Sequence, residues 1–465
     1  MATNFFVEFE AKLLEAGVST AAIRAFEHNY KGLSAGHTGM IPEERIQAVK
    51  ELPHADALPT EELPDPALLA QVVVVKLNGG LGTSMGLDRA KSLLQVKNGS
   101  CFLDFIVRQV LHLRHKSRVP LRFLLMNSFN TSRDTLQFLR KYPELGDTHE
   151  LELMQSQAPK VDAQTLRPAS WPSNPSLEWC PPGHGDFYPS LLASGWLQRL
   201  LEADVKFAFV SNADNLGATL DGRLLRYFAE SGKPFLMEVA ERTIADRKGG
   251  HLAQRGNRLL LRESAQCPEV DLPSFQDISR HRFFNTNNLW IRLDALKKVL
   301  AENDGLVPLP LIRNAKTVDP RDKTSPGVYQ LETAMGAAIE CFSNSGAIVV
   351  PRARFAPVKT TSDLLALRSD AFEVTEDWRI ILQPARKGIP PAVDLDPDHY
   401  KIVDQLERSI AEGAPSLRNC LELKVRGPVN FNSKVVFRGK VSVTNQASES
   451  RRLLPGEYAD QALML

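Results

Sequence analysis

A glycine-rich segment closely followed by a lysine is the clearest chemical signal in the sequence. The segment spans 77–86, reads LNGGLGTSMG, and is followed by Lys91 in AKSLLQV. Glycines let backbone N–H groups approach a phosphate without an intervening Cβ, and a lysine ammonium would meet the same oxygens. The segment is neither G-x-G-x-x-G nor a Walker loop, because Lys91 follows Ala90 rather than glycine. A tight turn without a ligand is the competing interpretation.

Two further positions suit phosphate and metal chemistry. Asp214 stands in SNADNLG, directly after a run that predicts a strand, and its carboxylate is a hard oxygen ligand of the kind that Mg²⁺ prefers. Lys359 precedes three hydroxyl residues at a predicted helix start, where N–H groups and a cation together favour an anion. An Asn/Asp turn and a surface lysine are the plainer alternatives. We expect Lys91 and Lys359 to be catalytic and Asp214 to hold the metal.

Histidine and amide side chains supply a second set of candidates. His184 lies between two glycines in PPGHGDF. Asn285, Thr286 and Asn287 alternate along FFNTNNLW, so two of them would face one pocket. Amides both donate and accept hydrogen bonds and therefore suit a sugar. A loop histidine without a role and a polar edge strand are the competing interpretations.

The elements that would carry these residues alternate between strand and helix. Apolar runs predict strands at 71–77, 121–127, 151–155, 206–212 and 235–241, and amphipathic runs predict helices at 131–142 and 221–230. Such alternation implies an open, mostly parallel α/β sheet, in which ligands bind beyond the carboxyl ends of the strands. The candidate residues fall at those ends.

Both ends of the chain differ from this middle. Helices are expected in the first 50 residues, with Ser19 capping the second, and four prolines between 52 and 66 predict a linker. Near the C-terminus apolar residues recur every six positions, in two sets: Leu423, Val429, Val435, Val441 and Val425, Phe431, Phe437, Val443. This repeat favours a parallel β-helix over an ordinary β-hairpin. The expected divisions are a helical segment and linker (1–70), a catalytic domain (71–385) and a left-handed parallel β-helix (386–465).

The overall composition excludes several classes of protein. The 465 residues include 56 Lys+Arg and 55 Asp+Glu, and this balance predicts no binding to nucleic acid or to anionic membranes. No apolar run is long enough to cross a bilayer, and the N-terminus does not resemble a signal peptide. The five cysteines form no CxxC pair, which argues against a zinc site or a disulfide framework and suits a reducing cytoplasm.

The glycine-rich segment also carries a family resemblance. LNGGLGTSMG followed by AKSLL resembles the signature of the UTP–glucose-1-phosphate uridylyltransferases, which usually have proline where this chain has Ala90. The related N-acetylhexosamine enzymes carry a loop nearer to LAGGQGTRLG. Seven blocks between 77 and 367 follow the family's order. The resemblance implies a Rossmann-like, GT-A-like nucleotidyltransferase fold.

The resemblance assigns roles to individual residues. Gln155, in MQSQAPK, and Gly183 would contact the uracil, and Lys359 the phosphates. The full set of implied nucleotide contacts is Leu77, Asn78, Gly79, Gly80, Lys91, Gln155, Gly183, Asn212 and Lys359. The implied sugar contacts are His184, Gly250, Asn285, Thr286, Asn287 and Glu332, although Glu332, in QLETAMGAAI, also fits an ordinary amphipathic helix.

The expected reaction is a single in-line displacement that depends on Mg²⁺. A hexose 1-phosphate, expected to be glucose 1-phosphate, attacks the α-phosphorus of UTP, and UDP-glucose and pyrophosphate are the products. Two alternatives remain open at this point: a broad-specificity UDP-sugar pyrophosphorylase and a non-catalytic nucleotide-binding scaffold. The short C-terminal repeat favours a monomer or a small homo-oligomer.

Overall fold

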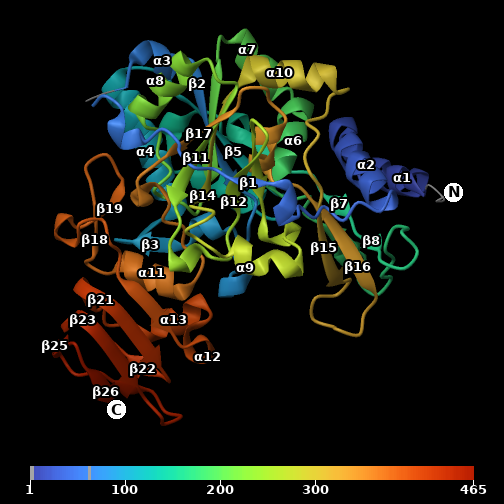
Figure 1. The fold of residues 1–465 in the computed structure, drawn as a ribbon. Helices are drawn as coiled ribbons and strands as arrows, with labels where there is room; N and C mark the ends of the chain where they lie inside the picture. The colour runs from blue at the N-terminus through green and yellow to red at the C-terminus, as the bar shows by residue number, and fades with distance from the viewer. Residues whose placement is uncertain (1–4, 61–63) are drawn as a thin grey trace.

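A ten-stranded mixed sheet organises the chain in the computed structural model, which describes residues 5–60 and 64–465 (Figure 1). Four strands pair side by side and parallel, in the order β10 (Phe207–Asn212), β2 (Val72–Asn78), β5 (Arg122–Asn127) and β6 (Glu152–Met154). Their carboxyl ends therefore lie along one edge. The run of valines in β2 is buried throughout, as expected for a strand covered on both faces.

The rest of the sheet is largely antiparallel and is built around β14 (Phe283–Arg292), which runs antiparallel to β10. The remaining strands are β11 (Phe235–Glu241), β17 (Gly346–Val349), β12 (His251–Arg255), β13 (Arg258–Arg262) and β1 (Gln47–Ala48). Because β14 is reversed, its beginning meets the carboxyl ends of the parallel strands. The prediction of a mixed, mostly parallel α/β sheet with flanking helices is confirmed at this level.

Alternate side chains of β2 enter two different hydrophobic cores, one on each face of the sheet. Val72 and Val74 pack in the cluster that contains α4 (Phe102–Ser117) and α8 (Gly222–Ser231). Val73 and Val75 pack in the cluster that contains α6 (Phe187–Ala193), α7 (Trp196–Glu202) and α10 (Leu293–Glu302). Shorter elements around these layers are α3 (Pro66–Ala70), α5 (Ser132–Leu139), α9 (Leu272–Phe275), β3 (Gln95–Lys97) and β4 (Ser100–Cys101).

The N-terminal helices pack on a separate small sheet at one end of the molecule. They are α1 (Phe6–Glu15) and α2 (Thr20–Ser34), and the predicted cap is present, since Ser19 Oγ accepts from Ala22 N at 3.3 Å. The sheet comprises β15 (Ile312–Thr317), β16 (Gly327–Glu332) and β8 (Val161–Asp162), with β7 (Ala158–Pro159) and β9 (Trp179–Cys180) nearby. Phe9, Phe26 and Tyr30 fill the shared core. The expected linker at 52–66 includes residues 61–63, which lie outside the described part.

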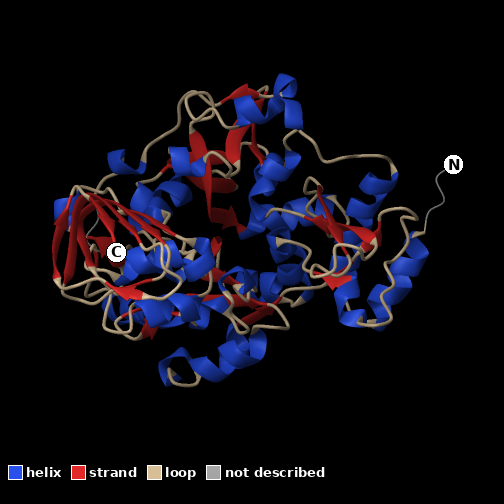
Figure 2. Cartoon of the chain, turned by 90° about the horizontal axis from the view of Figure 1, so that it is seen from below, coloured by secondary structure: helices blue, strands red, loops and turns tan. Residues whose placement is uncertain are grey.

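The C-terminal strands stack in parallel at the end opposite the N-terminus (Figure 1, Figure 2). The larger sheet contains β20 (Ala392–Leu395), β21 (Ser416–Arg426), β23 (Val435–Thr444), β25 (Gly456–Ala459) and β26 (Ala462–Met464), and the smaller pairs β22 (Val429–Asn430) with β24 (Arg451–Arg452). All eight apolar residues of the six-residue repeat are buried. Since β21 and β23 pair in parallel, the alternative of an ordinary hairpin is wrong.

Helices and a hairpin join the C-terminal strands to the central sheet. They are α11 (Thr361–Arg368), α12 (Pro397–Tyr400), α13 (Val403–Ser409) and the hairpin of β18 (Phe372–Val374) and β19 (Ile380–Leu382). One hydrophobic cluster runs from α4 through α11 to the C-terminal strands. Within residues 5–60 and 64–465, no helix has the length and apolar character needed to cross a membrane.

Candidate active site

A cavity of about 320 Å³ opens beyond the carboxyl ends of the parallel strands. It brings together most of the predicted nucleotide set: Leu77, Asn78, Gly79, Gly80, Lys91, Gln155, Gly183, Asn212, together with His184 and Asp214. Ser92, Met126, Pro181 and Ala213 complete the lining. Lys359, Gly250, Asn285, Thr286, Asn287 and Glu332 are not among the lining residues.

Lys91 is held by the glycine-rich segment that precedes it. Its backbone N–H donates to Gly80 O at 3.0 Å, which closes the segment into a loop. Its Nζ lies 2.6 Å from Asp214 Oδ2, and the two side chains are only 16% and 23% exposed. The ion pair therefore joins the loop after β2 to the loop after β10, at the mouth of two adjacent parallel strands.

Asp214 is the only carboxylate among the residues that line the cavity. In the described part of the chain, no group of three or more His, Cys, Asp or Glu side chains is arranged to hold a metal ion. Asn212 Oδ1 accepts from Asn287 Nδ2 at 3.0 Å. This donor set does not fit a resident metal with an all-protein shell. It fits Mg²⁺ bound through one carboxylate and completed by substrate phosphates and water.

Gln155 closes the cavity on the side of β6. Its Nε2 donates to Gly183 O at 3.1 Å. A carbonyl only accepts, so this bond fixes which end of the amide is the nitrogen. Its Oε1 points toward the glycine-rich segment, where a Cβ on Gly79 would lie 2.5 Å from it. Only glycine at 79 leaves room for this amide.

The backbone at Gly183 is shaped for the same close approach. Its φ of +81° is one that L side chains rarely adopt, and a Cβ there would come 2.5 Å from Thr333 O. The next residue, His184, accepts from Met335 N through Nδ1 at 3.0 Å. Burial lowers the pKa of His184 to about 4. The ring is therefore neutral near pH 7 with its proton on Nε2, so Nε2–H is a donor.

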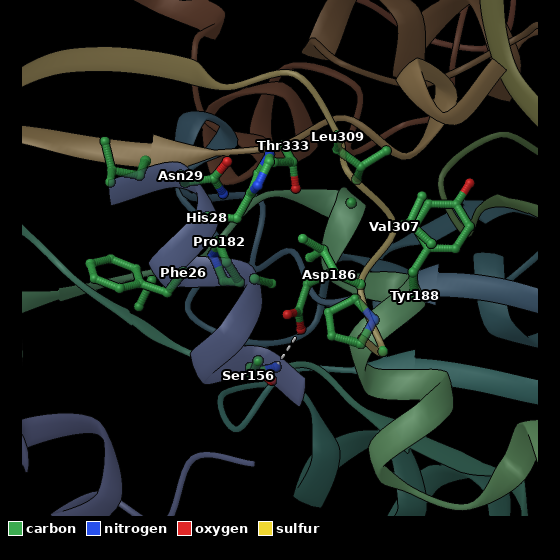
Figure 3. A pocket seen from close by; sticks show the side chains of 18 of the residues that line it. Phe26, His28, Asn29, Ser156, Pro182, Asp186, Tyr188, Val307, Leu309 and Thr333 are labelled. Carbon is green, nitrogen blue, oxygen red and sulfur yellow. Dashed lines mark hydrogen bonds between the residues drawn. The ribbon is translucent and has the colours of Figure 1, made fainter. Parts of the chain in front are cut away.

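Asp186 follows two residues after His184 and is hydrogen-bonded to Ser156, as the dashed line in Figure 3 marks. Its Oδ2 accepts from Ser156 N at 2.6 Å and from Ser190 Oγ at 2.8 Å. The first bond ties the residue after Gln155 to the His184 segment. Burial raises the pKa of Asp186 to about 7, although both hydrogen bonds lower it. The sequence analysis missed Asp186, although an acid directly after Gly-His-Gly was a visible signal.

Figure 3 also shows the small cavity that Asp186 borders, with Phe26, His28 and Asn29 of α2 across from it. The cavity measures about 30 Å³, which is room for roughly two water molecules. It is therefore too small for a nucleotide, and the larger cavity around Lys91 is the candidate substrate site.

A bulge in β14 shapes the predicted sugar side. Asn288 pairs with Glu238 while Asn285 pairs with the next residue of β11, Val239, so Thr286 and Asn287 are extra residues in the ladder. Thr286 turns into the sheet, where its hydroxyl donates to Glu238 O at 2.7 Å. This burial argues against direct sugar contact by the Thr286 hydroxyl.

Asn287 takes the opposite direction from Thr286. Its φ is +60°, and its Nδ2 donates to Asn212 Oδ1, which lines the cavity. Its own Oδ1 is buried and has no hydrogen-bond partner in the described part of the chain. Asn285 stays nearby, since its N–H donates to Gly250 O at 3.2 Å. The strand thus holds one buried, unpaired amide acceptor on a residue that is hydrogen-bonded to the cavity-lining Asn212.

Glu263 is a candidate that the sequence analysis missed, because nothing in LLLRESAQ distinguishes it. A Cβ on Gly250 would lie 2.5 Å from Glu263 Oε2, so the carboxyl packs directly on Gly250. Burial raises the pKa of Glu263, and the charge of Lys359 lowers it. Lys359 itself is exposed before α11, with its Nζ 5.9 Å from the centre of the Phe355 ring. These residues form a second polar group next to β14.

Glu332 lies at the end of β16, where its Cβ is 3.2 Å from the position of a Cβ on Gly183. Burial raises its pKa, and a hydrogen bond with Asn314 lowers it. Residues after it form a 3₁₀ helix, Met335–Glu340, so the alternative of one amphipathic helix through Glu332 is wrong. Glu332 adjoins the Gly183 segment.

Several known proteins are similar to this chain in sequence and in structure. A family profile described as UTP–glucose-1-phosphate uridylyltransferase matches residues 23–438. UTP–glucose-1-phosphate uridylyltransferase of Solanum tuberosum is 42% identical over 399 residues, covering 84% of this chain and 81% of the relative. Among solved structures, a variant of UDP-glucose pyrophosphorylase from Leishmania major in complex with UDP-glucose is 48% identical with a TM-score of 0.94, covering 100% of both chains. UDP-glucose phosphorylase from Trypanosoma brucei is 49% identical with a TM-score of 0.91, again covering 100% of both chains.

Proposed function

The chain belongs to the UTP–glucose-1-phosphate uridylyltransferase family, and from this premise we propose that it transfers the uridylyl group of UTP to glucose 1-phosphate. UDP-glucose and pyrophosphate are the products. One observation carries the proposal: Lys91 and Asp214 meet in a cavity that the glycine-rich segment, Gln155 and His184 also line. That cavity therefore offers charge for a phosphate chain and amide groups for a base.

The chemistry needs no protein nucleophile. A phosphate oxygen of glucose 1-phosphate forms a bond to the α-phosphorus of UTP, and the bond from that phosphorus to the pyrophosphate oxygen breaks. Since the attacking group is already an anion, catalysis consists of positioning and charge neutralisation. Lys91 parts from Asp214 and donates to phosphate oxygens, and Lys359 adds positive charge from the start of α11. His184 donates through Nε2–H without carrying charge.

Asp214 is the residue that would hold Mg²⁺. When bound, the metal supplies positive charge to the reacting phosphates. The single carboxylate in the cavity supports a metal that arrives on the nucleotide, rather than one stored in the free protein.

Selection of uracil would depend on the fixed amide of Gln155. One N–H of its Nε2 donates to Gly183 O, which sets the orientation of the amide and turns Oε1, an acceptor, toward the glycine-rich segment. Uracil carries an N3–H that donates to such an acceptor, whereas N3 of cytosine is itself an acceptor. A buried acceptor facing another acceptor loses a hydrogen bond on both sides, so CTP is disfavoured.

The hexose would lie toward β14. Asn287 Oδ1 is an unpaired buried acceptor, and Glu263 offers a second acceptor beside Gly250. A sugar hydroxyl would satisfy Asn287 Oδ1, since an unpaired buried acceptor is costly, and a second hydroxyl would donate to the half-buried Glu263 carboxylate, which already accepts from Gln266 N. Discrimination between glucose and galactose then depends on which hydroxyl each acceptor meets.

Several properties of the whole chain form part of the same proposal. We propose divisions at 1–70, 71–385 and 386–465, the last a left-handed parallel β-helix, supported by the parallel pairing of β21 with β23. We also propose a GT-A-like fold for the catalytic part, which the family membership supports. We further propose a monomer or small homo-oligomer without nucleic acid or membrane partners, located in the cytoplasm. The five unpaired cysteines support that location.

A substrate panel tests the proposed activity. Purified protein is incubated with UTP, Mg²⁺ and a set of sugar 1-phosphates, and pyrophosphate release is measured. The expected result is rapid release with glucose 1-phosphate and UTP, and little with CTP. Comparable rates with galactose 1-phosphate would favour a broad UDP-sugar pyrophosphorylase. UTP binding without any release would instead favour a non-catalytic scaffold.

A further inference from the structure

Asn215, the residue after Asp214, uses every donor and acceptor of its side-chain amide in hydrogen bonds within the protein. It is 2% exposed, so its amide is closed off from solvent. Its Oδ1 accepts from Gly217 N at 3.2 Å and from Ala356 N at 3.0 Å. Its Nδ2 donates to Arg354 O at 3.0 Å and to Asn288 Oδ1 at 3.3 Å. Two bonds accepted and two donated exhaust the amide, which therefore has no capacity left for a substrate.

These bonds join three segments that are far apart in the sequence. The first is the turn that carries Asp214, the second is the stretch that leads to Lys359, and the third is β14 just after Asn287. Backbone contacts also join the Asp214 turn to the stretch that leads to Lys359. Asn215 and Pro357 form an antiparallel bridge, and Val358 N donates to Asp214 O at 3.3 Å. Lys359 therefore directly follows a residue, Val358, that is hydrogen-bonded to the backbone of Asp214.

The partners of Asn215 rest on a buried ion pair. Arg354 binds Glu238 through Nε and Nη2, both at 2.7 Å, and Glu238 is fully buried. Asn288 Nδ2 donates to the same carboxylate at 3.0 Å. Arg354 Nη2 also donates to Thr219 O at 3.0 Å, which fixes the far end of the Asp214 turn. Because buried charges are costly to leave unpaired, the ion pair of Arg354 and Glu238 resists displacement.

We propose that Asn215 is a positioning residue that sets the spacing between Asp214 and Lys359. It touches neither substrate nor metal and acts by holding the Lys359 segment against the Asp214 turn. No other side chain reproduces its pattern, because aspartate has no donor for the Arg354 carbonyl and an apolar side chain offers neither donor nor acceptor. The inference rests on the proposed function, in which both residues serve one phosphate chain.

A double-mutant cycle tests this role. Asn215→Ala is expected to lower kcat about 10- to 100-fold, the scale of a small misplacement of a reacting group, and to change KM for UTP less. In a Lys359→Ala background the same substitution is expected to cost less than about threefold, because the group that it positions is gone. Fully multiplicative effects of the two substitutions would overturn the inference.

A second variant and a matched control separate positioning from folding. Asn432→Ala removes a buried amide in the C-terminal region, where Nδ2 donates to Leu453 O at 3.3 Å, and is expected to lower Tm without lowering kcat. Asn215→Asp retains an acceptor for Gly217 N and Ala356 N, and it enters the cycle if Asn215→Ala does not fold. If the wild type is active and the Asn215 variants, like Asn432→Ala, lower Tm without lowering kcat, the positioning role is contradicted. The proposed function is not affected by that result. An inactive wild type contradicts the proposed function, and the positioning role with it.

Discussion

The ammonium of Lys91 lies 2.6 Å from the carboxylate of Asp214, so the group proposed to meet phosphate occupies the position proposed for metal. The pair is enclosed, with the side chains 16% and 23% exposed. A divalent cation and an ammonium compete for one carboxylate oxygen, because each neutralises the same charge. In the proposed function, bound nucleotide would resolve this competition, because its phosphates would attract Lys91 and leave the Asp214 carboxylate free to hold the metal.

Removal of Lys91 should therefore strengthen metal binding to the free protein. Lys91→Ala leaves Asp214 unpaired, and we expect the affinity for Mn²⁺ in the absence of nucleotide to rise several-fold. Calorimetry or the Mn²⁺ electron-spin signal reports this without any turnover. Asp214→Asn is the matched control and should abolish the gain in the Lys91→Ala background. Unchanged Mn²⁺ affinity in Lys91→Ala would show that Lys91 does not compete with the metal for the Asp214 carboxylate.

The same substitution should cripple turnover. Lys91→Ala is expected to lower kcat by about 100-fold or more, the scale of one lost charge contact in a transition state. Initial rates of pyrophosphate release measure the effect. Lys434→Ala, which removes an exposed lysine in the C-terminal region, is the control and should retain wild-type rates. Near-normal turnover in Lys91→Ala would remove this residue from the chemistry.

A side chain at Gly79 should displace the amide of Gln155. A Cβ at this position would lie 2.5 Å from Gln155 Oε1, so Gly79→Ala must displace the amide proposed to read uracil. We expect KM for UTP to rise at least tenfold and discrimination against CTP to weaken. Gly327→Ala is the control, because its Cβ would meet nothing nearer than 3.8 Å. A UTP affinity in Gly79→Ala equal to that of the control would exclude Gln155 from base recognition.

Asp186 should make stability depend on pH near neutrality. Its pKa rises from an ordinary value of 3.8 to about 7 in the folded chain, so between these values the folded state binds more protons than the unfolded state. Its stabilising contribution is complete below pH 3.8 and is lost as pH rises through 7. Asp186→Asn keeps an acceptor for Ser156 N but cannot ionise. We expect a shallower fall of Tm between pH 5.5 and 8.5 in this variant, measured by thermal denaturation, and an identical profile would contradict the assignment.

Local sequence patterns were enough to locate the strands β2, β5, β6, β10 and β11, the helices α5 and α8, and most residues that line the candidate cavity. The valine run before the glycine-rich segment predicted a buried strand, and β2 spans Val72–Asn78 with that run buried. The parallel pairing of β2 with β10 places the segments that follow these two strands in one cavity. These segments contain the glycine-rich loop with its lysine and the Asn/Asp turn. Period-six burial at the C-terminus was likewise readable, because side-chain alternation is a local property.

The sugar side and the contacts between distant segments were decided by the tertiary structure. Antiparallel insertion of β14 and its bulge turn Thr286 inward and Asn287 toward Asn212, which strict alternation did not predict. Glu263 and Asp186 gain their shifted pKa values from burial by segments remote in sequence. The pairing of Lys91 with Asp214 crosses 123 positions of the chain. Strand propensity and turn chemistry depend on near neighbours and are written in the sequence, whereas register, bulges and ion pairs arise only when distant segments pack together.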